Sequence, residues 1–228
     1  MRFFFQPKKP VLETADQLVV DAYLAHFNNT TSGDTSLRTL RFVVLDLETT
    51  GLDIKKDRML SIAALPVQGF QVEVGHALER FVFQQGYMPD TSIAVHGIME
   101  KHLEGALEEK AILIELLDYL KDAIIVGHHI AFDLAVLNKA LQTHFHIKLK
   151  NKSLDTAALV RRIDGPTTGG QMPEKGPVSL DDLCAYFGIP LGRRHTSAED
   201  TFITAMVFLK LLSRIEDRGV HTYRELMR

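Results

Sequence analysis

The sequence predicts an α/β fold in which a mixed β-sheet carries helices on its faces. Three β-rich runs lie between residues 41 and 83. From about residue 108 onward, short apolar runs alternate with segments of helical periodicity, and that order is typical of α/β folds. Before residue 41, one helical segment is set apart by the polar stretch NNTTSGDTS, which is rich in turn-forming residues. The chain should therefore consist of one large domain with an appended helix.

The appended helix is predicted over residues 12–28. Its apolar residues Ala15, Leu18, Val19 and Ala22 recur at helical spacing, so they mark the face that would be buried. Two roles are open for it, packing on the main domain or docking a partner. We divide the chain into a helical extension with a linker, residues 1–40, and a main domain, residues 41–228.

The main domain begins with RFVVLDL, a β-rich run that precedes Gly51 and predicts a central strand. RMLSIAALPV and VEVGHALERFVF predict two more strands, joined by a turn near Gln68 and Gly69. Further on, the pattern predicts helices at 108–122, 130–145, 178–189 and 196–214, a strand in AIIVGH and a strand running into a helix over 153–163. Ser179 and Asp182 have the spacing of a capping box, and DGPTTGGQMPEKGP reads as a loop.

Composition excludes several classes of protein. The chain is 46% hydrophobic and 24% charged, with a net charge of −3, so no strong basic field points to nucleic acid. A single cysteine, Cys184, excludes a disulfide framework and a cysteine-based zinc site within one chain. The opening MRFFFQPKKP has too short an apolar core for a signal peptide, and no run reaches the length of a membrane span. We expect a cytoplasmic protein with no membrane partner.

Acidic residues occur where apolar ones are expected. Asp46 and Glu48 lie two apart near the end of the predicted central strand, so both side chains point to one face. Either both are solvated or a divalent cation relieves their repulsion. Asp133 interrupts an apolar helix, and His195 precedes Asp200 by five residues at the start of another. Each of these three also has an ordinary alternative, as a surface acid, a helix-entry residue and a first-turn charge.

In chain order these residues form Asp-x-Glu, an Asp after Gly-His-x-x-x-Phe, and His-x4-Asp. This set resembles the DEDDh branch of the DnaQ-like 3′–5′ exonucleases, the family of the proofreading subunit of bacterial DNA polymerase III. The resemblance extends from about Arg41 to Arg214 and includes VHGI at 95–98 and SLDDLCAYFGI. It departs from the family at His129, where an Asn is frequent.

The resemblance implies an RNase H-like fold with a central mixed five-stranded sheet. It also implies that His195 is a general base and that two cations, Mg²⁺ or Mn²⁺, are held by Asp46, Glu48, Asp133 and Asp200. Hard carboxylate oxygens suit these cations. The implied reaction is 3′–5′ hydrolysis of single-stranded or frayed DNA ends, releasing nucleoside monophosphates, with a DNA polymerase subunit as a possible partner. Two alternatives stay open: trimming of RNA or oligoribonucleotides, and a non-catalytic polymerase-associated module.

Substrate contacts are expected beside these residues. A tight turn at Thr49, Thr50 and Gly51 would offer backbone N–H groups to the terminal nucleotide. The last base and sugar would pack on Leu52, His96 and Phe132, because stacking tolerates any base, and His129 completes the predicted set. Ordinary turn and core roles are the alternative for all of them.

Overall fold

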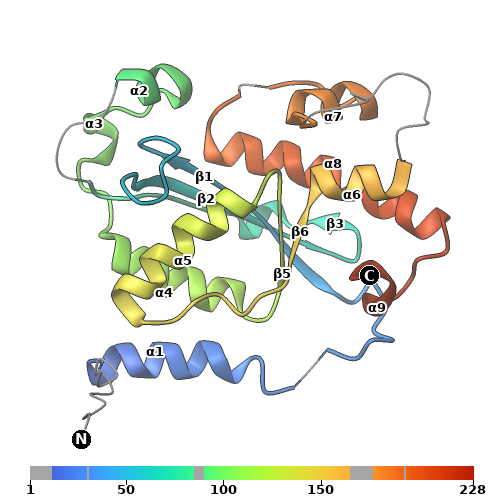
Figure 1. The fold of residues 1–228 in the computed structure, drawn as a ribbon, viewed down its shortest axis with the longest axis horizontal. Helices are drawn as coiled ribbons and strands as arrows, with labels where there is room; N and C mark the ends of the chain where they lie inside the picture. The colour runs from blue at the N-terminus through green and yellow to red at the C-terminus, as the bar shows by residue number, and fades with distance from the viewer. Residues whose placement is uncertain (1–11, 30, 85–89, 165–176, 193) are drawn as a thin grey trace, which may run out of the picture.

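The structure is a computed structural model that describes residues 12–29, 31–84, 90–164, 177–192 and 194–228 (Figure 1). Its strands are β1 (Arg41–Thr49), β2 (Met59–Gln68), β3 (Gln71–Val72), β4 (Leu78–Phe81), β5 (Ile124–Gly127) and β6 (Ser153–Asp155). Its helices are α1 (Thr14–Ala25), α2 (Asp90–His96), α3 (Glu100–Leu103), α4 (Glu109–Leu120), α5 (Ala131–Phe145), α6 (Thr156–Asp164), α7 (Leu180–Phe187), α8 (Ser197–Asp217) and α9 (Tyr223–Leu226), with a 3₁₀ turn η1 at Val74–His76.

The strands form one mixed sheet in the order β3-β2-β1-β5-β6, and β4 also pairs with β2. β1 pairs antiparallel with β2 and parallel with β5, which in turn pairs parallel with β6. The mixed α/β architecture is thus confirmed, and the part of the chain that the structure describes contains six strands in place of the expected five. The additional strand arises because the run 72–83 does not form one continuous strand.

Pro66 explains where that run divides. The backbone N–H of Glu73 donates to the Pro66 carbonyl at 2.9 Å, but Pro66 has no N–H to return the bond. The chain leaves the sheet at this point through η1 and rejoins β2 as β4, opposite Ser61 to Ala64. One predicted strand therefore becomes two short ones along the same edge of β2.

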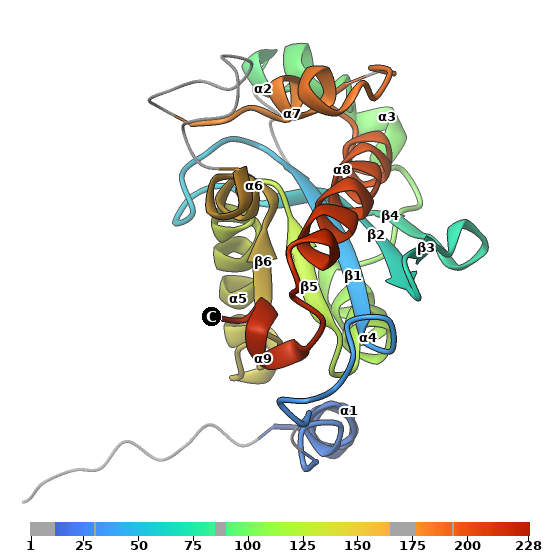
Figure 2. The same ribbon diagram turned by 90° about the vertical axis from the view of Figure 1, so that its right-hand side faces the viewer.

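Helices pack on both faces of the sheet (Figure 2), and each face buries its own apolar cluster. Phe42 and Val44 of β1 face α6, α7 and α8, and the Phe42 and Phe208 rings lie 5.0 Å apart. Val43 and Leu45 face α1, α4 and α5 on the other side. Because side chains alternate along a strand, Asp46 continues the face of Phe42 and Val44. The central strand therefore directs its acidic residues toward α8.

Helix α1 forms as predicted, but on a different face. Ala15, Leu18 and Ala22 are exposed, Leu18 to 65%, so the predicted apolar face is wrong except for partly buried Val19. The buried stripe consists instead of Asp16, Val20 and Tyr23. Spacings of four and three residues place these side chains on one face, and that face packs against α4 and α5.

Polar contacts explain this orientation of α1. The Tyr23 hydroxyl donates to Asn151 Oδ1 at 2.6 Å and accepts from the Lys150 backbone N–H at 2.8 Å. Asp16 forms a 2.8 Å ion pair with Lys110 of α4. A buried polar group is costly without a hydrogen-bond or ion-pair partner. Tyr23 and Asp16 can therefore point inward because Asn151, Lys150 and Lys110 supply those partners. Hydrophobic periodicity does not contain that information.

The stretch between α1 and β1 also packs on the main domain. Leu37 and Leu40 are buried in the cluster under α8. Leu37 N–H donates to the His221 carbonyl, and Tyr223 N–H donates to the Thr35 carbonyl, both at 2.9 Å. Part of the segment expected to be a linker therefore pairs with the C-terminal segment that leads into α9.

The remaining predictions agree closely with the structure. The Ser179–Asp182 capping box is present at the start of α7. Helices α2, α3 and α9 were not predicted, because each has seven residues or fewer and short helices carry little periodicity. Most of the predicted loop at 164–177 lies outside the described residues. Within the described ranges, no helix combines the length and apolar character that a membrane crossing requires.

Candidate active site

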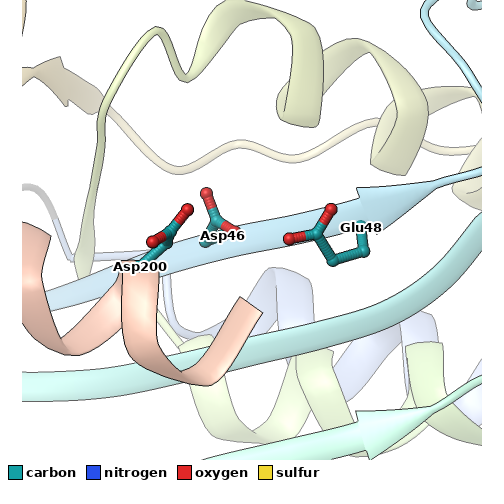
Figure 3. Close-up of side chains that lie close together, drawn as sticks. All are labelled: Asp46, Glu48 and Asp200. Atoms are coloured by element: carbon teal, nitrogen blue, oxygen red, sulfur yellow. The ribbon is translucent and has the colours of Figure 1, made fainter. Parts of the chain in front are cut away.

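Three of the predicted metal ligands converge at one end of the sheet. Asp46 and Glu48 extend from β1, and Asp200 extends toward them from the first turn of α8 (Figure 3). Each offers a carboxylate oxygen, and these oxygens all lie within 4.8 Å of one another. Such spacing allows one cation to contact all three groups. We call Asp46, Glu48 and Asp200 the acidic cluster.

Asp133 joins this end of the sheet from the other side. β1 pairs with β5 only from Phe42 to Val44, so the backbone of β1 beyond that point needs other partners. Asp133, in the first turn of α5, accepts a hydrogen bond from the Leu47 N–H at 3.1 Å through Oδ1. The carboxylate is buried and raises the pKa of Asp46 and Glu48 by its charge. It lies beside the acidic cluster without belonging to the mutually close trio.

Burial and mutual repulsion make these carboxylates poor acids. Burial first, and then the charges of Asp133, Glu48 and Asp200, raise the pKa of Asp46 well above its usual value. Burial first, and then the charges of Asp200 and Asp133, raise the pKa of Glu48 to about 7, and burial raises that of Asp133 to about 7. Without a cation, then, full ionisation is unfavourable at neutral pH. Hard oxygen ligands whose charge needs compensation fit a divalent cation such as Mg²⁺ or Mn²⁺.

The start of α8 fixes the position of Asp200. The Thr196 hydroxyl accepts from the Glu199 N–H at 3.3 Å and caps the helix. Ser197 Oγ lies 2.9 Å from Ser61 Oγ of β2, in a buried hydrogen bond. Since Ser61 is also the β2 residue opposite Glu48, these contacts align the first turn of α8 with the end of β1.

His195 lies immediately before this helix, outside the acidic cluster. Its side chain is exposed, and its backbone adopts a left-handed conformation with φ of 68°. Few residues other than glycine adopt such a φ, so a non-glycine residue there suggests a local constraint. His195 is thus next in sequence to Arg194, which contacts Asp200, but it is not one of the three mutually close residues of the acidic cluster.

Arg194 is a site residue that the sequence reasoning missed. Its Nε donates to Asp200 Oδ1 at 2.7 Å, and its Nη1 donates to Asp181 in the first turn of α7. The charge of Arg194 lowers the pKa of both Asp46 and Glu48, against the raising effects. The available signal was the pair of arginines directly before His195, a cationic stretch beside a helix start with acidic residues.

The loop after β1 is held by its own side chains. Thr49 donates to the Gly51 carbonyl at 2.6 Å, and Thr50 donates to Asp57 Oδ1 at 2.9 Å. A Cβ added to Gly51 would lie 2.6 Å from the Asp57 carboxylate. Asp57 also accepts from the Asp53 N–H at 2.6 Å. The threonine hydroxyls thus serve the turn, and Gly51 is required because the carboxylate lies so close.

The other predicted contact residues differ in exposure. Leu52 is 85% exposed, Phe132 is half-buried in the α5 cluster, and His96 is buried. The Ile98 N–H donates to His96 Nδ1 at 3.0 Å, and burial lowers the pKa of His96, so the neutral ring carries its proton on Nε2. His129 is exposed, and its Nε2 donates to the Val178 carbonyl at 3.0 Å. Leu52 is therefore the most accessible of them.

Comparison with known proteins places these features in a family. DNA polymerase III subunit epsilon of Aquifex aeolicus is 30% identical over 191 residues, covering 82% of this chain and 88% of that protein. The PolC-type DNA polymerase III of Staphylococcus saprophyticus is also 30% identical, over 194 residues that make up 85% of this chain but 13% of the polymerase.

Solved structures share the fold. Escherichia coli exonuclease I in complex with a dT13 oligonucleotide superposes with a TM-score of 0.67 at 17% identity, covering 79% of this chain and 43% of the other. Exonuclease X in complex with 5′ overhanging duplex DNA gives a TM-score of 0.60 at 19% identity, covering 82% and 98%. At these identities the similarity concerns the fold, and it confirms the RNase H-like prediction.

The model of the RNase_T exonuclease family matches residues 43–208. This range contains β1 with Asp46 and Glu48, the α5 residue Asp133, and the segment from His195 to Asp200. It spans most of the main domain and excludes α1 and α9. The chain therefore belongs to the exonuclease family.

Proposed function

We propose that this exonuclease removes nucleotides from the 3′ ends of single-stranded or frayed DNA with two divalent cations. The convergence of Asp46, Glu48 and Asp200, with buried Asp133 beside them, carries the proposal. The raised pKa values of Asp46, Glu48 and Asp133 mean that their negative charges are poorly compensated within the protein. Residues with strongly perturbed pKa values are concentrated at functional sites.

The residues of the chain divide the work between them. Asp46, Glu48, Asp133 and Asp200 would hold Mg²⁺ or Mn²⁺. When bound, such a cation pair activates water and compensates charge on the attacking and leaving oxygens of a phosphodiester. His195 accepts the proton of the attacking water through a ring nitrogen, since an imidazole nitrogen with a free lone pair is a suitable general base. Its exposed position next to Arg194 leaves that ring accessible to solvent and substrate.

Substrate positioning falls to the loop after β1 and to its neighbours. The turn at Thr49, Thr50 and Gly51 would present its backbone to the terminal nucleotide, while the threonine hydroxyls and Asp57 hold its conformation. The Thr50 N–H already donates to the Arg58 carbonyl at 3.0 Å, so any N–H contact would come from its neighbours. Leu52 and Phe132 offer apolar surface to the last base and sugar. His96 would support the turn from beneath, and His129 would line the approach from the α5 side.

DNA is the favoured substrate because the similar proteins include parts of DNA polymerases and an exonuclease bound to a DNA strand. The epsilon and PolC-type relatives are parts of DNA polymerase III, and the exonuclease I structure contains a dT13 strand. These properties belong to those proteins, and they support DNA and a polymerase subunit as partners of this chain. RNA or oligoribonucleotide trimming is the second candidate, because it would use the same carboxylates. A cytoplasmic location stays a prediction.

A digestion experiment tests the proposal. A single strand labelled at its 5′ end is incubated with Mg²⁺ or Mn²⁺, in DNA and RNA versions of one sequence. We expect a ladder of products that shortens from the 3′ end, released mononucleotides, and a faster reaction on DNA. A strand with a blocked 3′ end should resist. Shortening from the 5′ end would refute the direction, and equal activity of Asp46→Asn would refute the role of the acidic cluster.

A further inference from the structure

The guanidinium of Arg194 bridges the first turns of two helices. Nε and Nη2 donate to the two carboxylate oxygens of Asp200, at 2.7 and 3.4 Å, and Nη1 donates to Asp181 of α7. The Arg194 side chain is 18% exposed and that of Asp200 is 11% exposed, so this pair is well shielded from water. Paired N–H groups facing paired oxygens form the strongest geometry that an arginine offers a carboxylate.

Asp200 is also one of the three carboxylates of the acidic cluster. Both of its oxygens accept hydrogen bonds from Arg194, and a cation on Asp200 would draw on the negative charge of the same two oxygens. A guanidinium stays charged at any working pH, so it also repels a dication placed beside it. Arg194 and a divalent cation therefore compete for Asp200.

Asp181 is a second carboxylate partner that the guanidinium of Arg194 can keep when it leaves Asp200. It is the outer partner of the guanidinium, and its side chain is 60% exposed compared with 11% for Asp200. When a cation takes Asp200, Arg194 can keep its contact with Asp181 and turn outward. No buried charge is then left alone, which would otherwise be costly.

The backbone links this exchange to His195. His195 directly follows Arg194 and has a left-handed φ of 68°, and the next residue, Thr196, is the N-cap of α8. One side of His195 is therefore fixed by the helix cap, while the other is tied to Arg194. If the backbone of Arg194 moves when its side chain leaves Asp200, His195 is the residue between that movement and the fixed helix cap.

We propose that Arg194 is an exchangeable counter-cation of Asp200 and a positioning residue for His195. In the metal-free protein the guanidinium compensates the charge of Asp200. Cation binding displaces it toward Asp181, and the displacement turns His195 toward the site. The proposal rests on the proposed function, because it assumes that Asp200 is a cation ligand and that His195 acts at the same centre.

Cation affinity tests the exchange without any turnover. Mn²⁺ binding is measured by the electron paramagnetic resonance signal of the free ion, for wild type, Arg194→Lys and Arg194→Gln. Lys keeps the charge but loses the two-pronged contact, so Arg194→Lys should bind Mn²⁺ about fivefold more tightly, at the lower end of typical couplings between sites. A general charge effect would leave Arg194→Lys unchanged and alter Arg194→Gln alone, and that result would overturn the proposal. Weaker binding by Arg194→Lys would overturn it too, because Arg194 would then orient Asp200 for the cation.

Arg80→Lys is the matched control. Arg80 of β4 forms a similar two-pronged pair with Glu115 of α4, at 2.9 and 2.5 Å. Neither residue belongs to the acidic cluster or to the elements that carry it. The Mn²⁺ affinity of Arg80→Lys should equal that of wild type. If wild type and Asp46→Asn both fail to bind Mn²⁺, the proposed function fails. If wild type binds, Asp46→Asn does not, and Arg194→Lys matches wild type, only the exchange is wrong.

The link to His195 has its own measurement. The ring resonances of the histidines are followed by NMR during a Mg²⁺ titration, and His195→Gln identifies the signal of interest. In wild type the His195 signal should shift as Mg²⁺ binds. In Arg194→Gln, where there is no guanidinium to displace, the shift should be largely absent although Mg²⁺ still binds. An equal shift in both proteins would show that Arg194 does not position His195.

Discussion

At the scale of single residues, charge compensation governs the site. Asp46 and Asp200 both belong to the acidic cluster, but their surroundings differ. Asp46 is repelled by Asp133, Glu48 and Asp200. Asp200, by contrast, is paired with Arg194 at 2.7 Å. The two carboxylates should therefore respond in opposite ways when each is neutralised in the metal-free protein.

Asp46→Asn and Asp200→Asn make this difference measurable. Both should lower the rate with Mg²⁺ about a hundredfold or more, because metal contributions to catalysis amount to several kcal/mol. Without metal at pH 7, Asp46→Asn should raise the melting temperature, since repulsion is relieved. Asp200→Asn should lower it, because Arg194 loses its buried partner. Differential scanning calorimetry in EDTA compares them, and a rise for both variants would contradict the Arg194 pairing.

His195 should behave as a base and not as a structural residue. His195→Ala should lower the rate about 10²–10⁴-fold, the usual contribution of a positioned general base. The Mn²⁺ affinity should change little, because His195 is not a proposed cation ligand. His195→Gln preserves more of the shape and serves as the control. A rate close to that of wild type, together with a lower melting temperature, would instead assign His195 to helix entry.

At the scale of elements, α1 shows how a helix is oriented by its polar contacts. Tyr23 is buried only because Asn151 and the Lys150 N–H complete its hydrogen bonds. These residues belong to the segment between α5 and β6. The extension is therefore attached to the main domain at a defined point. We propose that α1 supports the domain while contributing nothing to the chemistry, which lies at the opposite end of β1.

Two substitutions on α1 test its orientation. Tyr23→Phe should lower the free energy of unfolding by about 1–3 kcal/mol, because it leaves buried hydrogen-bonding groups without a partner. Leu18→Ala, on the exposed face, should change it by less than about 0.5 kcal/mol. Urea unfolding followed by circular dichroism gives both values. The reverse order would restore the face predicted from periodicity.

Removal of residues 1–36 is the larger test of the same element. Activity on short single strands should persist at low temperature, because the acidic cluster lies on β1 and α8. The melting temperature should fall, since the faces of α4 and α5 that α1 covers would become exposed. Loss of all activity in a protein that is still folded would mean that α1 has a role in the reaction.

At the scale of the whole molecule, stability should depend on pH and on cations together. The pKa of Glu48 and that of Asp133 are raised to about 7, so the folded, metal-free protein binds protons more tightly than the unfolded chain. Stability then falls as pH rises from about 4 through about 7, because the unfolded state releases those protons first. Cations replace the protons, so this loss should disappear in Mg²⁺.

Thermal melting at several pH values, with EDTA or with Mg²⁺, measures the effect. In EDTA the melting temperature should decrease between pH 5 and about pH 8. The increase in melting temperature caused by Mg²⁺ should be small at low pH and large at high pH. A cation that binds the folded protein but not the unfolded chain stabilises the fold. In the Asp46→Asn variant both trends should weaken. A Mg²⁺ effect independent of pH would mean that these carboxylates are not the ligands.

The sequence predicted the elements of the fold more fully than the contacts between them. Strands such as β1 and helices such as α5 and α8 have strong local patterns, so their positions could be predicted. The orientation of α1 and the break at Pro66 depend on partners distant in sequence, which periodicity cannot reveal. Arg194 was missed for the same reason: its role follows from Asp200 and Asp181 meeting around it, and only the fold brings them together.

The position of β1 in the middle of the sheet has a consequence for ion size. β1 is hydrogen-bonded to β2 along its whole length and to β5 over part of it, so Asp46 and Glu48 have fixed places. Asp200 is attached through the first turn of a helix and faces the side chain of Arg194. A larger ion such as Ca²⁺, with ligand distances of about 2.3–2.6 Å instead of about 2.0–2.1 Å for Mg²⁺, must be accommodated on that side. Crystal structures with the two ions should superpose along β1 and differ at residues 194–200, so that ion selectivity resides in the start of α8.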